Sequence, residues 1–235
     1  MKIPGYGVQD GCVFAYDFGA GLTDGNLYRD LGPYNLGLSP VNFVAPNYGL
    51  AQGPSGATCL RFNGANQYGN LPLAFWAVSP TLSATFVVVA RHATALNGQR
   101  IFFARSGAPF NGLELIVAPS ARITLNGYSG GNLTGCVHTA DVPLAGRTRV
   151  TILSSVASSA VRLFGGWVDG PGVAMTDVAA GAVVTWGTSP ATVPNIGSAA
   201  GGNVWGGDLY FLGLWNYVFS NAEARALSAY WADRI

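Results

Sequence analysis

Carboxylates placed for acid–base chemistry are scarce in this chain, which has two glutamates, Glu114 and Glu223. A glycosidase needs two carboxyl groups about 5–9 Å apart across the scissile bond. On one strand that spacing requires acids at i and i+2 or i+4, and Glu114, in Leu113-Glu114-Leu115-Ile116, has no second acid on its face. Glu223 fits a helix cap. These residues predict that the protein is not a glycosidase, and we expect no enzymatic activity.

One short motif matches a nucleophile signature, because residues 127–131 read G-Y-S-G-G. The G-x-S-x-G pattern is meaningful only at a strand-to-helix elbow, and the following N-L-T-G is not helical. We therefore interpret it as a flexible turn after Asn126-Gly127. The two histidines, His92 and His138, have no metal-ligating partner at i+2 or i+4, so we expect surface or capping roles for both.

Metal and cofactor ligands are equally sparse. The three cysteines, Cys12, Cys59 and Cys136, form no CxxC or Cys/His cluster, which argues against zinc and predicts a buried free thiol at Cys59. Asp24 and Asp30 are the weak candidates for a small loop metal site, although turn-capping carboxylates are the favoured interpretation. We expect no cofactor.

Five aromatic residues lie among Gly, Pro and Asn, where the sequence gives no core face: Tyr34, Tyr48, Trp76, Tyr128 and Trp205. Aromatic side chains on loops can stack on sugar rings or anchor a protein interface. The alternative is that they fill the ends of the fold, since large aromatics dominate protein cores. Both interpretations stay open at this point.

The composition is apolar and poor in charge. Of 235 residues, 49% are hydrophobic and 10% are charged, with a net charge of +1 and 33 glycines; an ordinary soluble domain carries about 25% charged residues. With a single lysine and scattered arginines, a nucleic-acid-binding surface is not expected. No apolar run approaches the ~20 residues of a membrane helix, and the first residues, MKIPGYGVQDG, show no signal-peptide pattern. We expect synthesis in a reducing cytosol and no membrane association.

The elements that must position these residues are short strands. Apolar alternation separated by Gly, Pro, Asn and Ser is typical of an antiparallel sandwich. The predicted strands are 14–18, 60–62, 85–90, 101–104, 113–117, 122–125, 149–153, 161–168 and 209–218. Asp169-Gly170 predicts a tight hairpin turn. A capping box, Ser-Asn-Ala-Glu at 220–223, predicts one helix over 220–234.

The order of these segments resembles that of the concanavalin A-like lectin/glucanase superfamily, and in particular its laminin G-like jelly-roll domains. The segments concerned are VFAYDF (13–18), GATCLRFNGANQYGNLP (56–72), LSATFVVVAR (82–91), RVTILSSVASSAVRLFGGWVDG (149–170) and the closing stretch 195–227. The resemblance implies an all-β, two-sheet antiparallel jelly-roll sandwich with a short C-terminal helix. We expect an N-terminal arm over residues 1–12 and one sandwich domain over 13–235.

The departures from the family pattern concern its acids. Where the family has an acidic loop, with some of those acids ligating calcium, this chain has Asn63-Gly64-Ala65-Asn66-Gln67-Tyr68, and the family's I-D-E-V becomes Leu209-Tyr210-Phe211-Leu212. Calcium needs six to eight oxygen ligands, usually with several carboxylates. The glucanase motif E-x-D-x-x-E is also absent. We therefore expect a fold that does not depend on calcium.

Two functional hypotheses remain. The first is a structural module within a larger particle, such as a bacteriophage head-decoration or tail-associated protein located in the virion and assembled in the host cytoplasm. It would act as a homo-oligomer or against other subunits, with Ile3 and Tyr6 of the arm and the loop aromatics as anchors. The low charge favours it, since little repulsion opposes packing. The alternative is a lectin-like carbohydrate-binding module, with host-surface glycans as its expected ligands, which uses the same aromatics.

Overall fold

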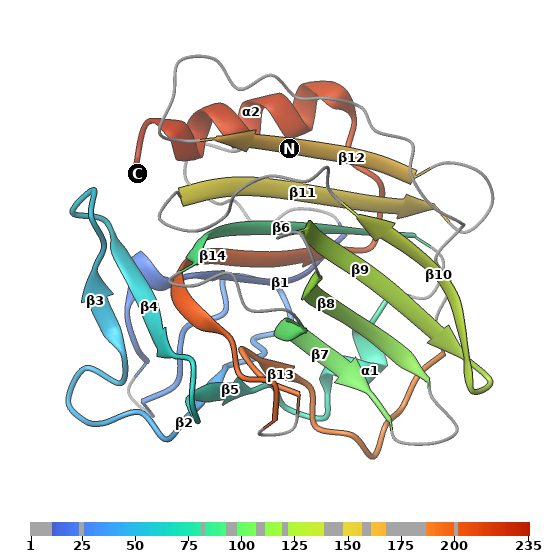
Figure 1. Ribbon diagram of the computed structural model, residues 1–235, viewed down its shortest axis with the longest axis horizontal. Coiled ribbons are helices and arrows are strands. Elements are labelled where there is room, and N and C mark those ends of the chain that lie inside the picture. Colours follow the sequence, from blue (N-terminus) through green and yellow to red (C-terminus); the bar gives the residue numbers. More distant parts are fainter. Residues whose placement is uncertain are drawn as a thin grey trace.

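The computed structural model describes residues 11–23, 26–80, 83–92, 98–106, 111–118, 122–138, 148–156, 161–167, 187–199 and 202–235. Within these residues the chain folds into two antiparallel sheets that pack face to face, with a helix against the outer side of one of them (Figure 1).

The first sheet has seven strands, and the bounds of its strands are β1 Cys12–Asp17, β3 Leu50–Gln52, β4 Thr58–Asn63, β6 Ser83–His92, β11 Thr148–Val156, β12 Val161–Trp167 and β14 Gly206–Trp215. Their order is β12–β11–β6–β14–β4–β3, and β1 also pairs with β14. Strand β6 lies in the middle of this order because it is apolar on both faces, as the sequence of residues 85–90 predicts.

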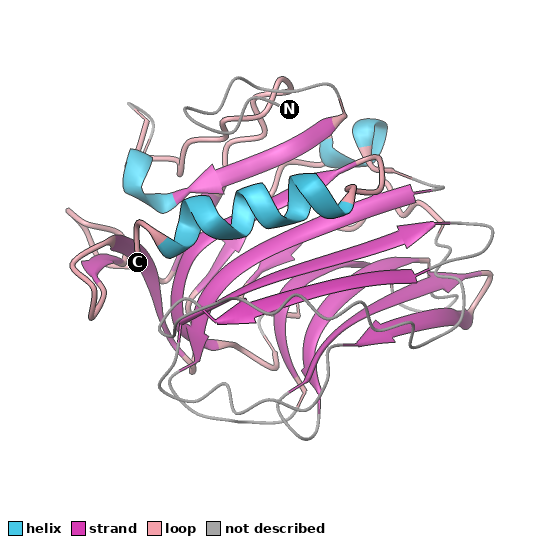
Figure 2. Ribbon diagram, turned by 90° about the horizontal axis from the view of Figure 1, so that it is seen from above, coloured by secondary structure: helices cyan, strands magenta, loops and turns pink. Residues whose placement is uncertain are grey.

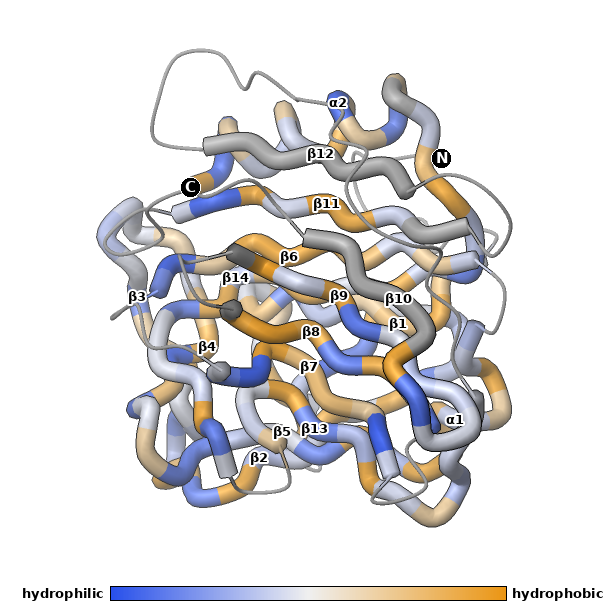
Figure 3. Tube along the Cα trace, turned by 45° about the vertical axis from the view of Figure 1, so that its right-hand side comes forward, coloured by the Kyte–Doolittle hydropathy of each residue, from blue (hydrophilic) through white to orange (hydrophobic). Residues whose placement is uncertain are grey.

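The second sheet also has seven strands, and their bounds are β2 Ser39–Val41, β5 Tyr68–Asn70, β7 Gln99–Arg105, β8 Gly112–Ala118, β9 Arg122–Ser129, β10 Asn132–His138 and β13 Asn195–Ile196. The order is β10–β9–β8–β7–β13–β5–β2. Figure 3 shows β7, β8 and β9 of this sheet side by side, with hydrophobic and hydrophilic residues alternating along β9.

Two apolar clusters follow from the alternation of side chains along the strands. Phe86 and Val88 of β6 face the second sheet and join the core between the sheets, whereas Val87 and Val89 face outward. The outward residues pack under helix α2 (Asn221–Ala232), which lies across the first sheet (Figure 2). The remaining described elements are a three-residue 3-10 helix (Phe18–Ala20) and the four-residue helix α1 (Phe75–Val78).

Most predicted elements are confirmed. Phe14, Tyr16 and Phe18 all face the core between the sheets, as their alternation predicts. Helix α2 begins at the predicted capping box, in which the Ser220 hydroxyl accepts from the Glu223 N–H while the Glu223 carboxylate accepts from the Ser220 N–H. Strand β1 begins at Cys12, so the sandwich starts one residue before the predicted boundary.

The predicted turn at Asn126-Gly127 is wrong. Both residues stay extended within β9, paired with Glu114 and Leu113 of β8. The chain reverses later, at Gly130 and Gly131, whose φ angles of 59° and 91° suit glycine. The G-Y-S-G-G motif therefore lies in a β-hairpin and not at a strand-to-helix elbow. The Asp169-Gly170 turn lies outside the described residues.

Candidate functional site

Two of the predicted loop aromatics belong to the core. Trp205 is fully buried, and its indole N–H donates to His92 Nδ1 at 2.8 Å. Trp76 is 6% exposed and donates to the carbonyl of Thr192 at 2.7 Å. Both residues fill the fold, so neither offers a ring to a ligand. The expectation of a surface or capping role for His92 is also wrong, because its side chain is 1% exposed.

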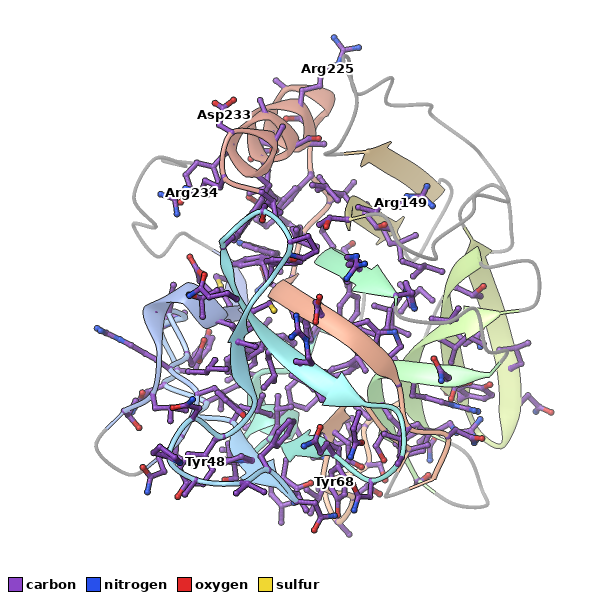
Figure 4. All side chains as sticks on the ribbon, turned by 60° about the vertical axis from the view of Figure 1, so that its left-hand side comes forward. Tyr48, Tyr68, Arg149, Arg225, Asp233 and Arg234 are labelled. Atoms are coloured by element: carbon purple, nitrogen blue, oxygen red, sulfur yellow. The ribbon has the colours of Figure 1, made fainter. Side chains whose placement is uncertain are left out.

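The other predicted aromatics differ in exposure. Tyr34 is 49% exposed and lies on a loop, whereas Tyr48 is partly buried and packs against the core between the sheets. Figure 4 shows Tyr48 at the end of the molecule opposite helix α2. Tyr128 lies on β9, not on a loop. Ile3 and Tyr6 fall outside the described residues.

The weak metal candidate Asp30 is a turn-capping residue. Its carboxylate accepts from the backbone N–H groups of Ala15, Gly32 and Leu36 at 2.9, 2.7 and 2.8 Å. These bonds hold the loop after β1 and account for the carboxylate. Asp24 lies outside the described residues, and within the described ranges no group of three or more His, Cys, Asp or Glu could hold a metal ion.

A polar cluster lies instead on the outer face of the second sheet. Leu113, Leu115 and Val117 of β8 point into the core between the sheets, so alternation turns Glu114 outward. Glu114 pairs directly with Asn126 of β9, and Tyr128 follows two residues later on the same face. Two arginines of β7, Arg100 and Arg105, complete what we call the Glu114 cluster (Arg100, Arg105, Glu114, Asn126 and Tyr128).

A β-bulge in β7 brings the two arginines together. Arg100 and Arg105 are five residues apart, an odd spacing that places side chains on opposite faces of a regular strand. The register shifts between Arg100 and Phe102, where β7 has one more residue than β8. The extra residue returns the alternation to the other phase, and Arg105 therefore shares the outer face with Arg100.

The two carboxylate oxygens of Glu114 differ in the number of hydrogen bonds that they accept. Its Oε1 accepts from Asn126 Nδ2 at 3.1 Å and from the Tyr128 hydroxyl at 2.8 Å. Its Oε2 lies 3.5 Å from Arg100 Nε, an ion pair longer than an ordinary hydrogen bond. Oε2 and Arg100 Nε are both buried, with no hydrogen-bond partner among the residues that the structure describes. An acceptor and a donor thus lie side by side with unused bonding capacity.

The guanidinium of Arg105 stacks on the ring of Tyr128, with Cζ 4.3 Å from the ring centroid, and Nη1 lies 3.9 Å from Glu114 Oε1. Burial, followed by the hydrogen bond to Glu114 and the charge of Glu114, raises the pKa of Tyr128 to about 12. The phenol therefore stays protonated at neutral pH and acts as a donor to Glu114.

The polar face continues along the sheet from this cluster. Across the strands, Glu114 pairs with Phe103 of β7, Phe103 with Asn195 of β13, and Asn195 with Asn70 of β5. Asn195 Nδ2 donates to Asn70 Oδ1 at 2.6 Å. The register therefore places amides and an aromatic ring in one row beside the Glu114 cluster.

A second ionic cluster lies on the outer face of the first sheet, away from helix α2. Arg61 donates to Asp208 twice, from Nε to Oδ1 at 2.7 Å and from Nη2 to Oδ2 at 3.3 Å. Arg91 Nη1 lies 3.4 Å from Asp208 Oδ2. The three residues belong to neighbouring strands β4, β14 and β6. Because two N–H groups of the Arg61 guanidinium donate to Asp208, we interpret this cluster as an ion pair that connects neighbouring strands.

The Glu114 cluster combines one acid with two arginines, an amide and a phenol. Among the described strand residues of the second sheet, Glu114 is the only carboxylate. The cluster offers hydrogen-bond donors, one acceptor and an aromatic face.

Among the described residues, no helix has the length and apolar character that a membrane span requires.

The sequence alone pointed to Tyr128 but missed its partners. Alternation around Glu114 could have shown that this acid faces outward. Arg100 and Arg105 could not have been assigned to one face, because the bulge in β7 leaves no clear mark in the sequence.

No family model and no curated protein matches the sequence. Its fold, however, is similar to that of solved structures. The sialidase of Trypanosoma rangeli in complex with sialic acid matches with a TM-score of 0.54 and 13% identity over 95% of this chain. This chain spans 33% of the length of that sialidase.

Two further structures show the same likeness. The CBM40 module of a Ruminococcus gnavus IT-sialidase, bound to α2,3 sialyllactose, has a TM-score of 0.53 and 12% identity, over 72% of this chain and 95% of that one. The binding domain of botulinum neurotoxin DC in complex with SialylT has a TM-score of 0.58 and 8% identity, over 94% and 51% of the two chains. These likenesses concern the fold, a two-sheet antiparallel β-sandwich.

Proposed function

We propose that this protein is a non-catalytic, lectin-like module that binds carbohydrate through the outer face of its second sheet. The observation that carries the proposal is the Glu114 cluster, where the partly exposed side chains of Arg100 and Arg105 lie beside Glu114 and the ring of Tyr128. Sugar hydroxyls accept hydrogen bonds as well as donate them, so they suit a face that carries guanidinium groups. The ring of Tyr128 adds the aromatic surface that saccharide sites commonly use.

The fold comparisons support the same class of ligand. The CBM40 module was solved bound to α2,3 sialyllactose and to α2,6 sialyllactose, and it matches most of its own length to this chain. We therefore take host or environmental glycans, including sialylated ones, as the first ligands to test. The single carboxylate in the described second sheet supports binding without turnover.

A structural role within a larger particle, such as a virion, has narrower support. It rests on the low content of charged residues, 10% of the chain. The large hydrophobic side chains exposed on the described surface are Tyr34, Val44, Leu73, Leu133 and Val193. Single exposed apolar residues are ordinary on a monomer. Multi-angle light scattering tests the homo-oligomer form of this hypothesis, which requires a mass well above the 24.3 kDa of one chain.

A glycan array tests the binding proposal. We expect the wild-type protein to be retained on a subset of glycans, and Tyr128→Ala to lower the affinity at least about tenfold, equivalent to about 1.4 kcal/mol. The matched control is Tyr230→Ala, which removes a ring of helix α2 on which Arg234 stacks at 4.1 Å. That stack is of the same kind but lies outside the second sheet. Retention that is equally reduced by both variants, or absent in the wild type, would contradict the proposal.

A further inference from the structure

We propose that the protein has a second saccharide-binding site, formed by residues 42–49 and 63–68, whose ligand is a neutral sugar. We call these two segments the amide loops. The site is separate from the Glu114 cluster, because strands β8, β7 and β13 lie between β9, which carries Tyr128, and β5, which begins at Tyr68. At about 4.8 Å per strand, the two sites are about 19 Å apart.

The two amide loops lie side by side. At one end, Asn42 Nδ2 donates to the carbonyl of Asn66 at 2.9 Å. At the other end, the N–H of Arg61, just before the second loop, donates to the carbonyl of Gly49 at 2.9 Å. Two segments that are separated in the sequence therefore contribute to one surface.

Several amide groups on this surface have no partner within the protein. The side chains of Asn42, Asn63 and Asn66 are exposed, and that of Gln67 is half-buried. Asn66 Oδ1 accepts from Asn63 Nδ2 at 2.9 Å, and Gln67 Oε1 accepts from the Asn63 N–H at 2.9 Å. Among the described residues, these bonds leave Asn42 Oδ1, Asn66 Nδ2 and Gln67 Nε2 unused. One acceptor and two donors thus remain for a ligand.

The amide loops also carry two half-buried tyrosines, Tyr48 and Tyr68. Figure 4 shows both at the end of the molecule opposite helix α2. A Cβ on Gly69 would meet the core residue Leu38 at 2.8 Å, so alternation along β5 turns the neighbouring Tyr68 away from the core. A tyrosine ring that is fixed by its strand and partly exposed offers an apolar face to the C–H surface of a sugar ring.

The backbone of Tyr48 is strained. Its φ angle is 45°, a conformation that bulky residues rarely adopt. Its N–H donates to the carbonyl of Val44 at 3.0 Å, and its own carbonyl accepts from the hydroxyl of the buried Tyr28. These contacts hold a ring at a position that glycine or asparagine would occupy with less strain. Strained positions of this kind cluster at ligand-binding sites.

The absence of charge in the amide loops determines the class of ligand. Between positions 31 and 90 the sequence has one charged residue, Arg61, and it forms an ion pair with Asp208. A charged ligand group would lose its hydration here without gaining an opposite charge, which is unfavourable. Amides and sugar hydroxyls, in contrast, each offer both donors and acceptors to the other.

A protein partner fits this surface less well than a sugar. Interfaces between proteins depend on a few large anchors in a desolvated centre. The large hydrophobic side chain that is exposed in the amide loops is Val44, at 80%, and single exposed apolar residues are ordinary on a monomer.

The test is isothermal titration of the full chain with three neutral probes: maltotriose, cellotriose and mannotriose. We expect at least one probe to bind, with an affinity that changes less than about twofold between about 0.05 and 0.5 M salt, because no charge takes part. Tyr68→Ala is expected to lower that affinity at least about tenfold, because the stacking ring is lost. Tyr128→Ala, in the Glu114 cluster, and Tyr230→Ala, on helix α2, are expected to leave it unchanged.

Two further variants keep the test decisive. Tyr68→Phe retains the ring and is expected to keep the affinity within about threefold of the wild type, since only a hydroxyl is lost. Tyr48→Asn removes the other ring at a position whose φ angle suits asparagine. It is expected to fold even if Tyr68→Ala does not, and to lower the affinity at least about fivefold. Thermal melts verify that each variant is folded.

The outcomes separate this inference from the proposed function. If a neutral probe binds and is lost in Tyr128→Ala but not in Tyr68→Ala or Tyr48→Asn, the second site is overturned and binding at the Glu114 cluster stands. If no neutral probe binds, the second site is overturned whatever the glycan array shows. If the chain self-associates and Tyr68→Ala abolishes the association without any effect on sugars, the amide loops form a protein contact and the inference is also overturned.

Discussion

At the scale of single residues, the buried His92 is the clearest titrating group outside the candidate site. An indole nitrogen is only a donor, so His92 Nδ1 must be unprotonated to accept from Trp205 Nε1. Burial, followed by the charge of Arg149, lowers the pKa of His92 to about 4 from 6.5. Protonation of Nδ1 would point its N–H at the indole N–H and would put a second positive charge near Arg149.

This arrangement predicts a pH-dependent stability. Because the folded-state pKa is the lower one, the unfolded chain takes up the proton first as the pH falls. We expect the free energy of unfolding to be fully retained above about pH 6.5 and to fall by about 3 kcal/mol as the pH drops to about 4. Urea unfolding at a series of pH values measures it.

The second histidine provides the control for this prediction. The chain has two histidines, so His138→Gln should leave the decline between pH 6.5 and 4 in place, while His92→Gln should reduce it. If the free energy of unfolding falls equally steeply with pH in the wild type and in His92→Gln, then His92 titrates normally in the folded protein and the prediction is wrong.

At the scale of elements, helix α2 depends on its first turn and on the face that it buries. Ser220 and Glu223 satisfy each other's backbone N–H groups, while Ala224, Leu227 and Trp231 pack on the first sheet. Capping fixes where the helix begins, and apolar packing supplies most of its stability.

We expect Ser220→Ala to lower the free energy of unfolding by about 1 kcal/mol, because one N–H of the first turn loses its acceptor. Chemical denaturation measures the change. In a double-mutant cycle with Glu223→Ala, the two losses should add to more than the loss in the double variant, since the two residues form one capping box. Strictly additive losses would contradict a cooperative box.

Strand β7 shows how an element can determine a site. Its bulge between Arg100 and Phe102 sets the phase of the alternation, and with it the face on which Arg105 lies. A one-residue change of register would turn Arg105 into the apolar core. The binding chemistry proposed here therefore depends on a backbone irregularity as much as on the residue types.

At the scale of the whole molecule, the loop at 63–67 is organised by amide side chains and contains no acid. Asn63 Oδ1 accepts from the N–H groups of Ala65, Asn66 and Gln67 at 2.9, 3.1 and 3.3 Å. A neutral amide thus organises the turn by itself. This hydrogen-bonded loop joins β4 of the first sheet to β5 of the second.

We expect the melting temperature to change by less than about 1 °C on adding EDTA or millimolar calcium, because a ligand stabilises a fold only if the folded state binds it. Differential scanning calorimetry gives the measurement. A drop of several degrees with EDTA, restored by calcium, would show a metal site and contradict this prediction.

Local patterns in the sequence were enough to predict the fold class. Period-2 alternation and turn residues are local signals, and they predicted the strands, the apolar face of β1 and the capped helix. They also showed that paired acids are missing around Glu114. Local signals failed where the turn preference of two residues is outweighed by strand pairing. Asn126-Gly127 favours a turn, but it stays extended in β9 because β8 and β10 pair with it on both sides.

Which residues share a surface depends on contacts between segments that are far apart in the sequence. Trp76 and Trp205 are set among turn residues in the sequence, but each finds a buried hydrogen-bond partner from another segment, Thr192 and His92. Glu114 meets Asn126 through strand register and Arg100 and Arg105 through a bulge. Register and bulges are set by the pairing and packing of whole strands, so the energies that place these side chains together belong to contacts between segments and not to any one stretch of sequence.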